Sequence, residues 1–244
     1  MQTKTQALPL LAKSHDASMR ATLTDIIWDF DGTILPFDSE QALLRSLLHQ
    51  PQRKVGVAKA LFGRLLAWAD ERNYLEGPFK RLYAFCLRGL PVTELDAVAE
   101  EIARQITPAD RLAIRTLASA GKGMVIVSCG TGDLSQRVLQ CAGISDCFVA
   151  LEANWFTFWQ NYIEGIDLHI HLPHDKLEAV ARLGIDFANA VAIGDGVTDM
   201  PLLDRAACAI LVDRNGKKAT WAATRGYRVA RSLTEVANLL GVID

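Results

Sequence analysis

Short apolar runs alternate with segments of helical periodicity along most of the chain. The runs are too short for helices and too continuously apolar for strands with one solvent face, so each predicts a strand covered on both faces. Helical patterns at about 133–142 and 174–183 separate them. The alternation predicts an α/β fold, a doubly wound and mainly parallel sheet. The predicted strands lie at 26–28, 124–128, near 148–151, 191–194 and 209–212.

The segment from Pro36 to about Pro108 interrupts this alternation. Its apolar residues recur at helical spacing only, which predicts a second, smaller all-helical domain inserted after the first strand. We therefore divide the chain into an N-terminal tail at 1–20, a catalytic core at 21–35 and 106–244, and a helical cap at 36–105.

The composition of the chain argues against nucleic-acid and membrane partners. Half of the 244 residues are apolar, 22% are charged, and the formal net charge is only −2, with no basic patch, so we expect no nucleic-acid partner. No apolar run approaches the about eighteen residues of a membrane span, so no membrane partner is expected either. Five cysteines without CxxC spacing indicate a reducing compartment, and we expect a cytoplasmic location. The oligomeric state stays open.

Polar residues follow the predicted strands at their carboxyl ends, where ligands bind in such sheets. The first strand is followed by two acids, the second by a serine and glycines, and the fourth by further acids, with a lysine starting the helix between. These residues are Asp29, Asp31, Gly32, Ser128, Gly130, Gly132, Lys176, Asp195 and Asp199.

These residue types suit phosphoryl transfer. Crowded carboxylates repel one another unless a hard divalent cation lies among them, so Mg²⁺ is the expected cofactor. With the cation bound, Asp29 can attack phosphorus, and Lys176 and Ser128 can stabilise the phosphoryl oxygens. Backbone N–H groups at Gly32 and Gly130 can do the same.

Four segments resemble, in order and spacing, the four motifs of the haloacid dehalogenase superfamily. They are Asp29–Thr33 (DFDGT), Val127–Gly130 (VSCG), Lys176, and Gly194–Asp199 (GDGVTD). The resemblance spans the chain from about Thr24 onward, and the helical insert resembles the cap of the phosphoserine phosphatase branch. One such motif is moderately specific, whereas four in order are strong support.

The resemblance implies a role for each motif residue. Asp29 would be the nucleophile, and Asp31 would protonate the leaving oxygen and later activate water. Asp29, Asp31 through its backbone carbonyl, and Asp195 would ligate the metal, with Asp199 as a supporting acid. Gly32, Ser128, Gly130 and Lys176 would bind phosphate.

Asp31 bears on the reaction, because an alkoxide leaving group needs a proton and a halide does not. Dehalogenases of the superfamily lack this acid, so we expect a Mg²⁺-dependent phosphatase that hydrolyses a small-molecule phosphomonoester through an aspartyl-phosphate. A phosphoryl mutase or phosphotransferase, and a non-enzymatic binding module on the same fold, are the alternatives.

The cap departs from the phosphoserine phosphatase pattern. The acid expected nine residues after the nucleophile is Asp38 rather than glutamate, and Tyr83 stands where the cap arginine would be. Arg81 is close in sequence, although two positions on a helix differ by roughly 200°. Val197–Thr198 in the fourth motif is more similar to the methionine-salvage phosphatases. Asp38, Arg81 and Tyr83 are therefore the candidate specificity residues.

The aromatic cluster between Trp155 and Trp159 has no assigned role. It could form a lid, contact another subunit, or pack against neighbouring helices, and we favour packing.

Overall fold

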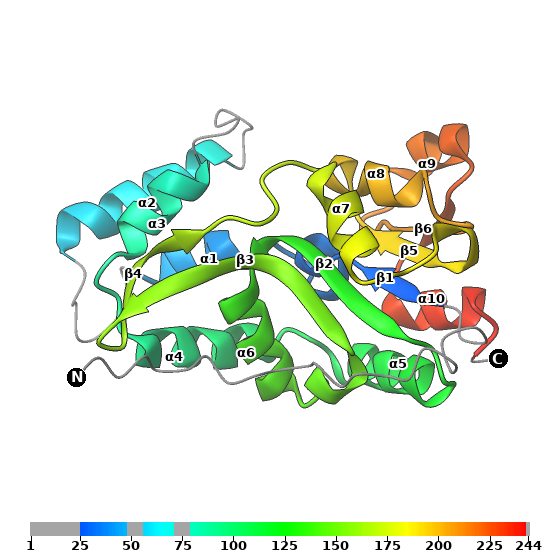
Figure 1. Cartoon of the computed structure of the whole chain (residues 1–244), viewed down its shortest axis with the longest axis horizontal. Helices are drawn as coiled ribbons and strands as arrows, with labels where there is room; N and C mark the ends of the chain where they lie inside the picture. The colour runs from blue at the N-terminus through cyan, green and yellow to red at the C-terminus, as the bar shows by residue number, and fades with distance from the viewer. Residues whose placement is uncertain (1–24, 48–55, 71–78, 243–244) are drawn as a thin grey trace.

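The computed structural model of the chain describes residues 25–47, 56–70 and 79–242, apart from the side chains of Val57 and Asp70. The predicted tail at 1–20 lies outside these ranges. Figure 1 shows a central sheet with helices on both sides and a group of helices at one end.

The sheet has seven strands in the order β4-β3-β2-β1-β5-β6-β7. Every pair is parallel except β3 with β4. The predicted doubly wound, mainly parallel α/β fold is therefore confirmed. The strands are β1 Ile26–Trp28, β2 Met124–Thr131, β3 Ala150–Trp159, β4 Tyr162–Asp167, β5 Val191–Gly194, β6 Cys208–Val212 and β7 Arg228–Ala230.

Helices lie on both faces of the sheet: α7, α8 and α9 on one, and α5, α6 and α10 on the other (Figure 1). Among the described residues, no helix combines the length and the apolar character needed to cross a bilayer. The helices are α1 Ser39–Ser46, α2 Val57–Asp70, α3 Phe79–Leu87, α4 Val92–Ala103, α5 Pro108–Ser119, α6 Gly132–Ala142, α7 Asp175–Arg182, α8 Met200–Leu203, α9 Ala219–Arg225 and α10 Leu233–Leu239, with short helical turns at Phe30–Ile34, Ser145–Cys147, Phe187–Asn189 and Val197–Asp199.

Alternation along β1 explains its continuously apolar sequence. Ile26 and Trp28 pack into one buried cluster, whereas Ile27 packs into a second cluster on the opposite face. All three side chains are fully buried. Successive side chains of a strand point to opposite faces. When both faces are covered, every side chain is buried, so every position is apolar.

Helices α1–α4 follow β1, as the insert was predicted to do. They share the first buried cluster with the sheet and its helices: Leu44 and Tyr83 belong to the same cluster as Ile114 and Leu134. The division at 36–105 remains a prediction, and the hydrophobic core is continuous across it.

A β-hairpin occupies the aromatic region. β3 runs well past the predicted 148–151, and Gln160 and Asn161, at φ +47° and +64°, connect it to β4. Phe156 is buried and stacks on Tyr83 at 5.9 Å between ring centroids, whereas Trp159 is 57% exposed. The expected packing against a helix thus holds for Phe156 and not for Trp159, which lies at the end of the hairpin.

Candidate active site

The chain turns sharply after β1, and this turn presents the first two acids. Asp29 N–H donates to the carbonyl of Ile193 in β5 at 2.8 Å, which continues the sheet by one residue. Gly32 then adopts φ +81°, and a Cβ there would lie 2.5 Å from Cγ of Asp195. Only glycine combines that φ with such a close approach, so the turn brings β1 and the end of β5 together.

Lys176 lies at the start of α7 and links two acids. Its Nζ donates to Oδ1 of Asp29 at 2.8 Å and to Oδ1 of Asp199 at 2.6 Å, with only 1% of its side chain exposed. The other oxygen of Asp199 accepts from the N–H groups of Asp195 at 2.9 Å and Gly196 at 3.2 Å. Asp199 therefore holds both the lysine and the loop after β5 in place.

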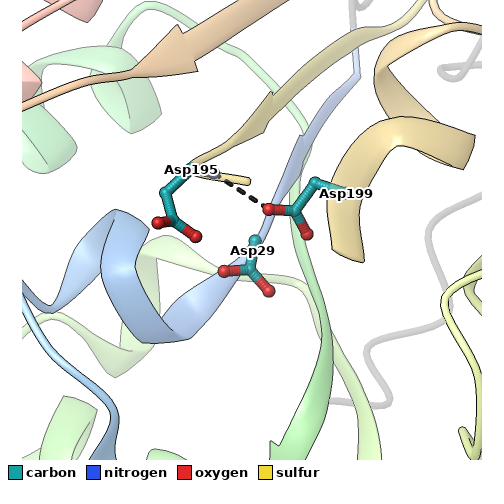
Figure 2. A group of neighbouring side chains, drawn as sticks. All are labelled: Asp29, Asp195 and Asp199. Carbon is teal, nitrogen blue, oxygen red and sulfur yellow. Dashed lines mark hydrogen bonds between the residues drawn. The ribbon is translucent and has the colours of Figure 1, made fainter. Parts of the chain in front are cut away.

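Three carboxylates converge at the ends of β1 and β5 (Figure 2). Asp29, Asp195 and Asp199 each offer one oxygen, and these oxygens lie within 4.8 Å of one another. Lys218 Nζ also donates to Asp195 Oδ2, at 2.9 Å. Hard oxygen donors at this density fit a Mg²⁺ ion. The predicted metal ligands were Asp29, Asp195 and the backbone carbonyl of Asp31. The third side chain in the observed cluster is that of Asp199, which was predicted as a supporting acid.

Burial and the proximity of neighbouring carboxyl groups raise the pKa values of Asp29, Asp31 and Asp195. Burial, followed by the charge of Asp199, raises the pKa of Asp29 to about 7 against the pull of Lys176. Burial and then Asp38 raise the pKa of Asp31 well above its ordinary value, and burial raises that of Asp195. Burial alone would lower the pKa of Lys176, but Asp199 and Asp29 outweigh it and the pKa lies well above the ordinary value. The site thus has a surplus of negative charge that a cation would relieve.

Asp31 faces the end of β2. Its Oδ1 accepts from the N–H of Ser39 at 2.8 Å, and a Cβ on Gly130 would lie 2.7 Å from its Oδ2. Ser128 is buried, and its Oγ accepts from the N–H of Gly130 at 2.9 Å. Gly130 therefore approaches Asp31 closely, and Ser128 borders the same cleft, the convergence that the sequence predicted.

These groups line a cleft of about 380 Å³. Most predicted site residues border it, and Asp199 lies buried beside it. Gly132 is elsewhere, beneath the ring of Trp155, where a Cβ would meet the ring at 2.8 Å. The lining residues are Asp29, Asp31, Gly32, Pro36, Phe37, Asp38, Glu40, Lys80, Ser128, Cys129, Gly130, Lys176, Asp195 and Thr198.

Of the three candidate specificity residues, one borders the cleft. Asp38 does, and its side chain also caps α1 by accepting from the N–H of Gln41 at 2.9 Å. Arg81 is exposed and Tyr83 is fully buried, and neither is among the lining residues. Thr131 Oγ1 lies 3.5 Å from the hydroxyl of Tyr83, so this tyrosine packs behind the cleft.

Glu40 and Lys80 are the charged cleft residues that sequence reasoning missed. Lys80 pairs with Oε2 of Glu40, and the hydroxyl of Thr131 donates to Oε1. Glu40 is 2% exposed, and burial raises its pKa although Lys80 opposes the shift. The sequence did hold a cue: Lys80 lies one helical turn before the buried Tyr83, so it falls on the inner face of α3.

The model of the haloacid dehalogenase-like hydrolase family matches residues 26–204. No curated protein matches the chain. Three similar solved structures are each 19% identical to it. A protein of unknown function from Bordetella pertussis Tohama I has a TM-score of 0.67, over 85% of this chain and 98% of that one. A HAD family hydrolase from Salmonella enterica serovar Typhi has a TM-score of 0.64, over 86% of this chain and 69% of that one. A phospho-aspartyl intermediate analogue of phosphoserine phosphatase has a TM-score of 0.63, over 91% of this chain and 99% of that one.

Proposed function

Because the chain belongs to the haloacid dehalogenase-like hydrolase family, we propose that it is a Mg²⁺-dependent phosphatase. It would hydrolyse a small-molecule phosphomonoester through a phosphoryl group carried covalently by Asp29. The observation that carries the proposal is the pair Asp29 and Asp31 at the end of β1, with Lys176 bonded to the first acid and the second bordering the same cleft.

Asp29 would be the nucleophile. One carboxylate oxygen attacks phosphorus, a bond forms between them, and the bond from phosphorus to the ester oxygen breaks. The hydrogen bond from Lys176 keeps the carboxyl oriented, and its positive charge opposes the rise that burial gives to the pKa of Asp29. Mg²⁺, held by Asp29, Asp195 and the backbone carbonyl of Asp31, would offset the repulsion between the carboxylate and the phosphate.

Asp31 would handle the protons. Burial raises the pKa of its carboxyl well above the ordinary value, which favours the protonated form that can donate to the departing alkoxide. The resulting carboxylate then accepts a proton from the water that attacks phosphorus, which releases inorganic phosphate and restores Asp29. The N–H of Ser39 at 2.8 Å fixes the orientation of Asp31 in both steps.

The phosphoryl oxygens need donors, and the cleft offers several. Gly32, Ser128, Gly130 and Lys176 border it, and the serine hydroxyl and the lysine ammonium can donate to a phosphoryl group. Such preorganised donors stabilise charge that grows in the transition state. An acid in the position of Asp31 also favours ester hydrolysis over dehalogenation, and the solved structure of a phosphoserine phosphatase with a phospho-aspartyl analogue is a precedent on this fold.

Phosphate release from a panel of small phosphomonoesters tests the proposal, with and without Mg²⁺. We expect turnover that needs the metal, falls by at least about a thousandfold in Asp29→Asn, and falls strongly in Asp31→Asn. Acid quench of the wild type during turnover should trap labelled phosphate on the protein, and Asp29→Asn should trap none. Full activity of Asp29→Asn would overturn the assignment of the nucleophile.

A further inference from the structure

The apolar side chains on the exposed face of α2 are larger than most of those on its buried face. Leu61 and Leu65, one turn apart, are 57% and 58% exposed, and Phe62 is 37% exposed. Facing inward are Ala60, Leu66 and Ala67, which are 1%, 3% and 1% exposed, so only one large apolar side chain among those described on α2 is buried. A helix that only covers a core carries its large apolar residues inward, so the outer face of α2 is built for a further contact.

This apolar surface continues onto α3. Phe85 is 54% exposed, and its ring meets Phe62 edge to face at 6.5 Å between centroids. Lys59 Nζ lies 5.1 Å from the Phe85 ring centroid and donates to the carbonyl of Arg88 at 3.2 Å. The two helices therefore present one surface, the α2–α3 face, made by Leu61, Phe62, Leu65 and Phe85.

The charged side chains that the structure describes on the two helices have one sign. Arg64, Arg81 and Arg88 are exposed, and every charged side chain that the structure describes on α2 and α3 is cationic. The whole chain has a net charge of −2, so this excess is local. A partner that matches the face must offer an apolar interior and an anionic boundary.

We propose that the α2–α3 face binds an anionic membrane surface. Leucine and phenylalanine would enter the boundary between headgroups and acyl chains, and the arginines would lie at the lipid phosphates. A second copy of this chain fits less well, because two such faces would bring their arginines together. A nucleic acid would pair with the arginines but would leave Leu61 and Leu65 without an apolar environment.

The contact is peripheral. Fourteen residues of α2 extend about 21 Å, short of the roughly 30 Å hydrocarbon core, so the helix would lie along the surface. The expectation that no membrane is a partner rested on the lack of a long apolar run in the sequence. An outward apolar face on a short helix needs no such run.

Vesicle co-sedimentation of the full chain tests the proposal. The probes are vesicles of phosphatidylglycerol with phosphatidylcholine, and vesicles of phosphatidylcholine alone. We expect binding to the anionic vesicles that weakens with added salt. Leu61→Gln with Leu65→Gln should weaken it at least about tenfold. Arg64→Gln with Arg81→Gln should weaken it about fivefold for each arginine removed.

Leu112→Gln is the matched control, because Leu112 is 65% exposed on α5, far from α2 in Figure 1. It should bind as the wild type does. Thermal unfolding and hydrolysis of a water-soluble ester without vesicles should be unchanged in the leucine variant, which separates this test from that of the phosphatase. Equal binding by the wild type and the leucine variant, or no binding, overturns the proposal. A dimer that the leucine variant dissociates would assign the face to a second copy instead.

Discussion

The two walls of the cleft are built differently. On the core wall, Asp29 and Asp195 directly follow the adjacent parallel strands β1 and β5, Ser128 lies in the neighbouring strand β2, and Lys176 joins them from the start of a helix. On the cap wall, Phe37 and Asp38 precede α1, and the pair of Glu40 and Lys80 spans two helices.

The comparison teaches that the topology of the sheet positions the acids of the core wall, whereas single side chains on helices form the cap wall. A core-wall residue cannot move without moving a strand. A cap-wall residue can change alone, provided that its buried charge partner changes with it. The predictions below test this contrast.

The largest effect should come from Lys176→Met on the core wall. It leaves Asp29 and Asp199 buried without their shared cation, so we expect activity to fall by about a thousandfold or more. The free energy of unfolding of the metal-free protein should fall by about 3–5 kcal/mol. Steady-state kinetics and urea unfolding measure the two. Lys218→Met is the control, since that lysine is 41% exposed and its removal should cost much less. Equal losses in the two variants would contradict the contrast.

On the cap wall, the second prediction concerns the pair of Glu40 and Lys80. Lys80→Met alone leaves a carboxylate that is 3% exposed without its cation, and we expect a loss of about 3 kcal/mol in the free energy of unfolding. Adding Glu40→Gln should recover at least half of that loss, because the amide still accepts from Thr131. A double-mutant cycle by urea unfolding measures the coupling. Additive losses would show that the pair is not a unit.

The third prediction concerns substrate choice. The side chain of Lys80 is 19% exposed at the cleft, so it can meet an anionic leaving group. For esters that carry a carboxylate or a second phosphate, kcat/KM in Lys80→Met with Glu40→Gln should fall about tenfold, as expected for one lost charged contact. Esters of neutral alcohols should change little. A uniform loss across both groups of esters would place Lys80 in folding or catalysis rather than in specificity.

The smallest effect should be the pH dependence of the metal-free protein. The pKa of Asp29 is raised to about 7 from 3.8, so between these values the folded state holds a proton that the unfolded state has lost. Stability should therefore fall as the pH rises through this window. Thermal unfolding in chelator at pH 5 and pH 7 should show a Tm lower at pH 7 by about 5–9 °C. Asp29→Asn should reduce this difference, and an unchanged difference would assign it to other groups.

The same contrast explains what the sequence could predict. The apolar runs identified β1, β2, β5 and β6, and the topology of a parallel sheet then placed Asp29, Ser128 and Asp195 at one edge. Neither step needs knowledge of distant contacts. The roles of these residues remain predictions, although the structure brings them together.

The cap wall escaped prediction because it depends on tertiary contacts. Glu40 and Lys80 are forty positions apart, and only the packing of α1 against α3 makes them partners. The resemblance to the family pointed instead to Tyr83, with Arg81 as a possible substitute, and the structure buries Tyr83 and exposes Arg81. β4 was missed because all its residues except Ile163 are at least partly exposed and because it pairs with a strand whose aromatic residues suggested helix packing.

Strand β3 limits how chimeras of this protein with related proteins can be designed. β3 pairs with β2 at its beginning and with β4 at its end, and Tyr162 at the start of β4 bridges to Pro91. A graft that swapped residues 36–105 for the cap of a relative would leave this hairpin facing a foreign surface. A working chimera would have to carry 150–167 as well, because these two segments contact each other although they are separate in the sequence.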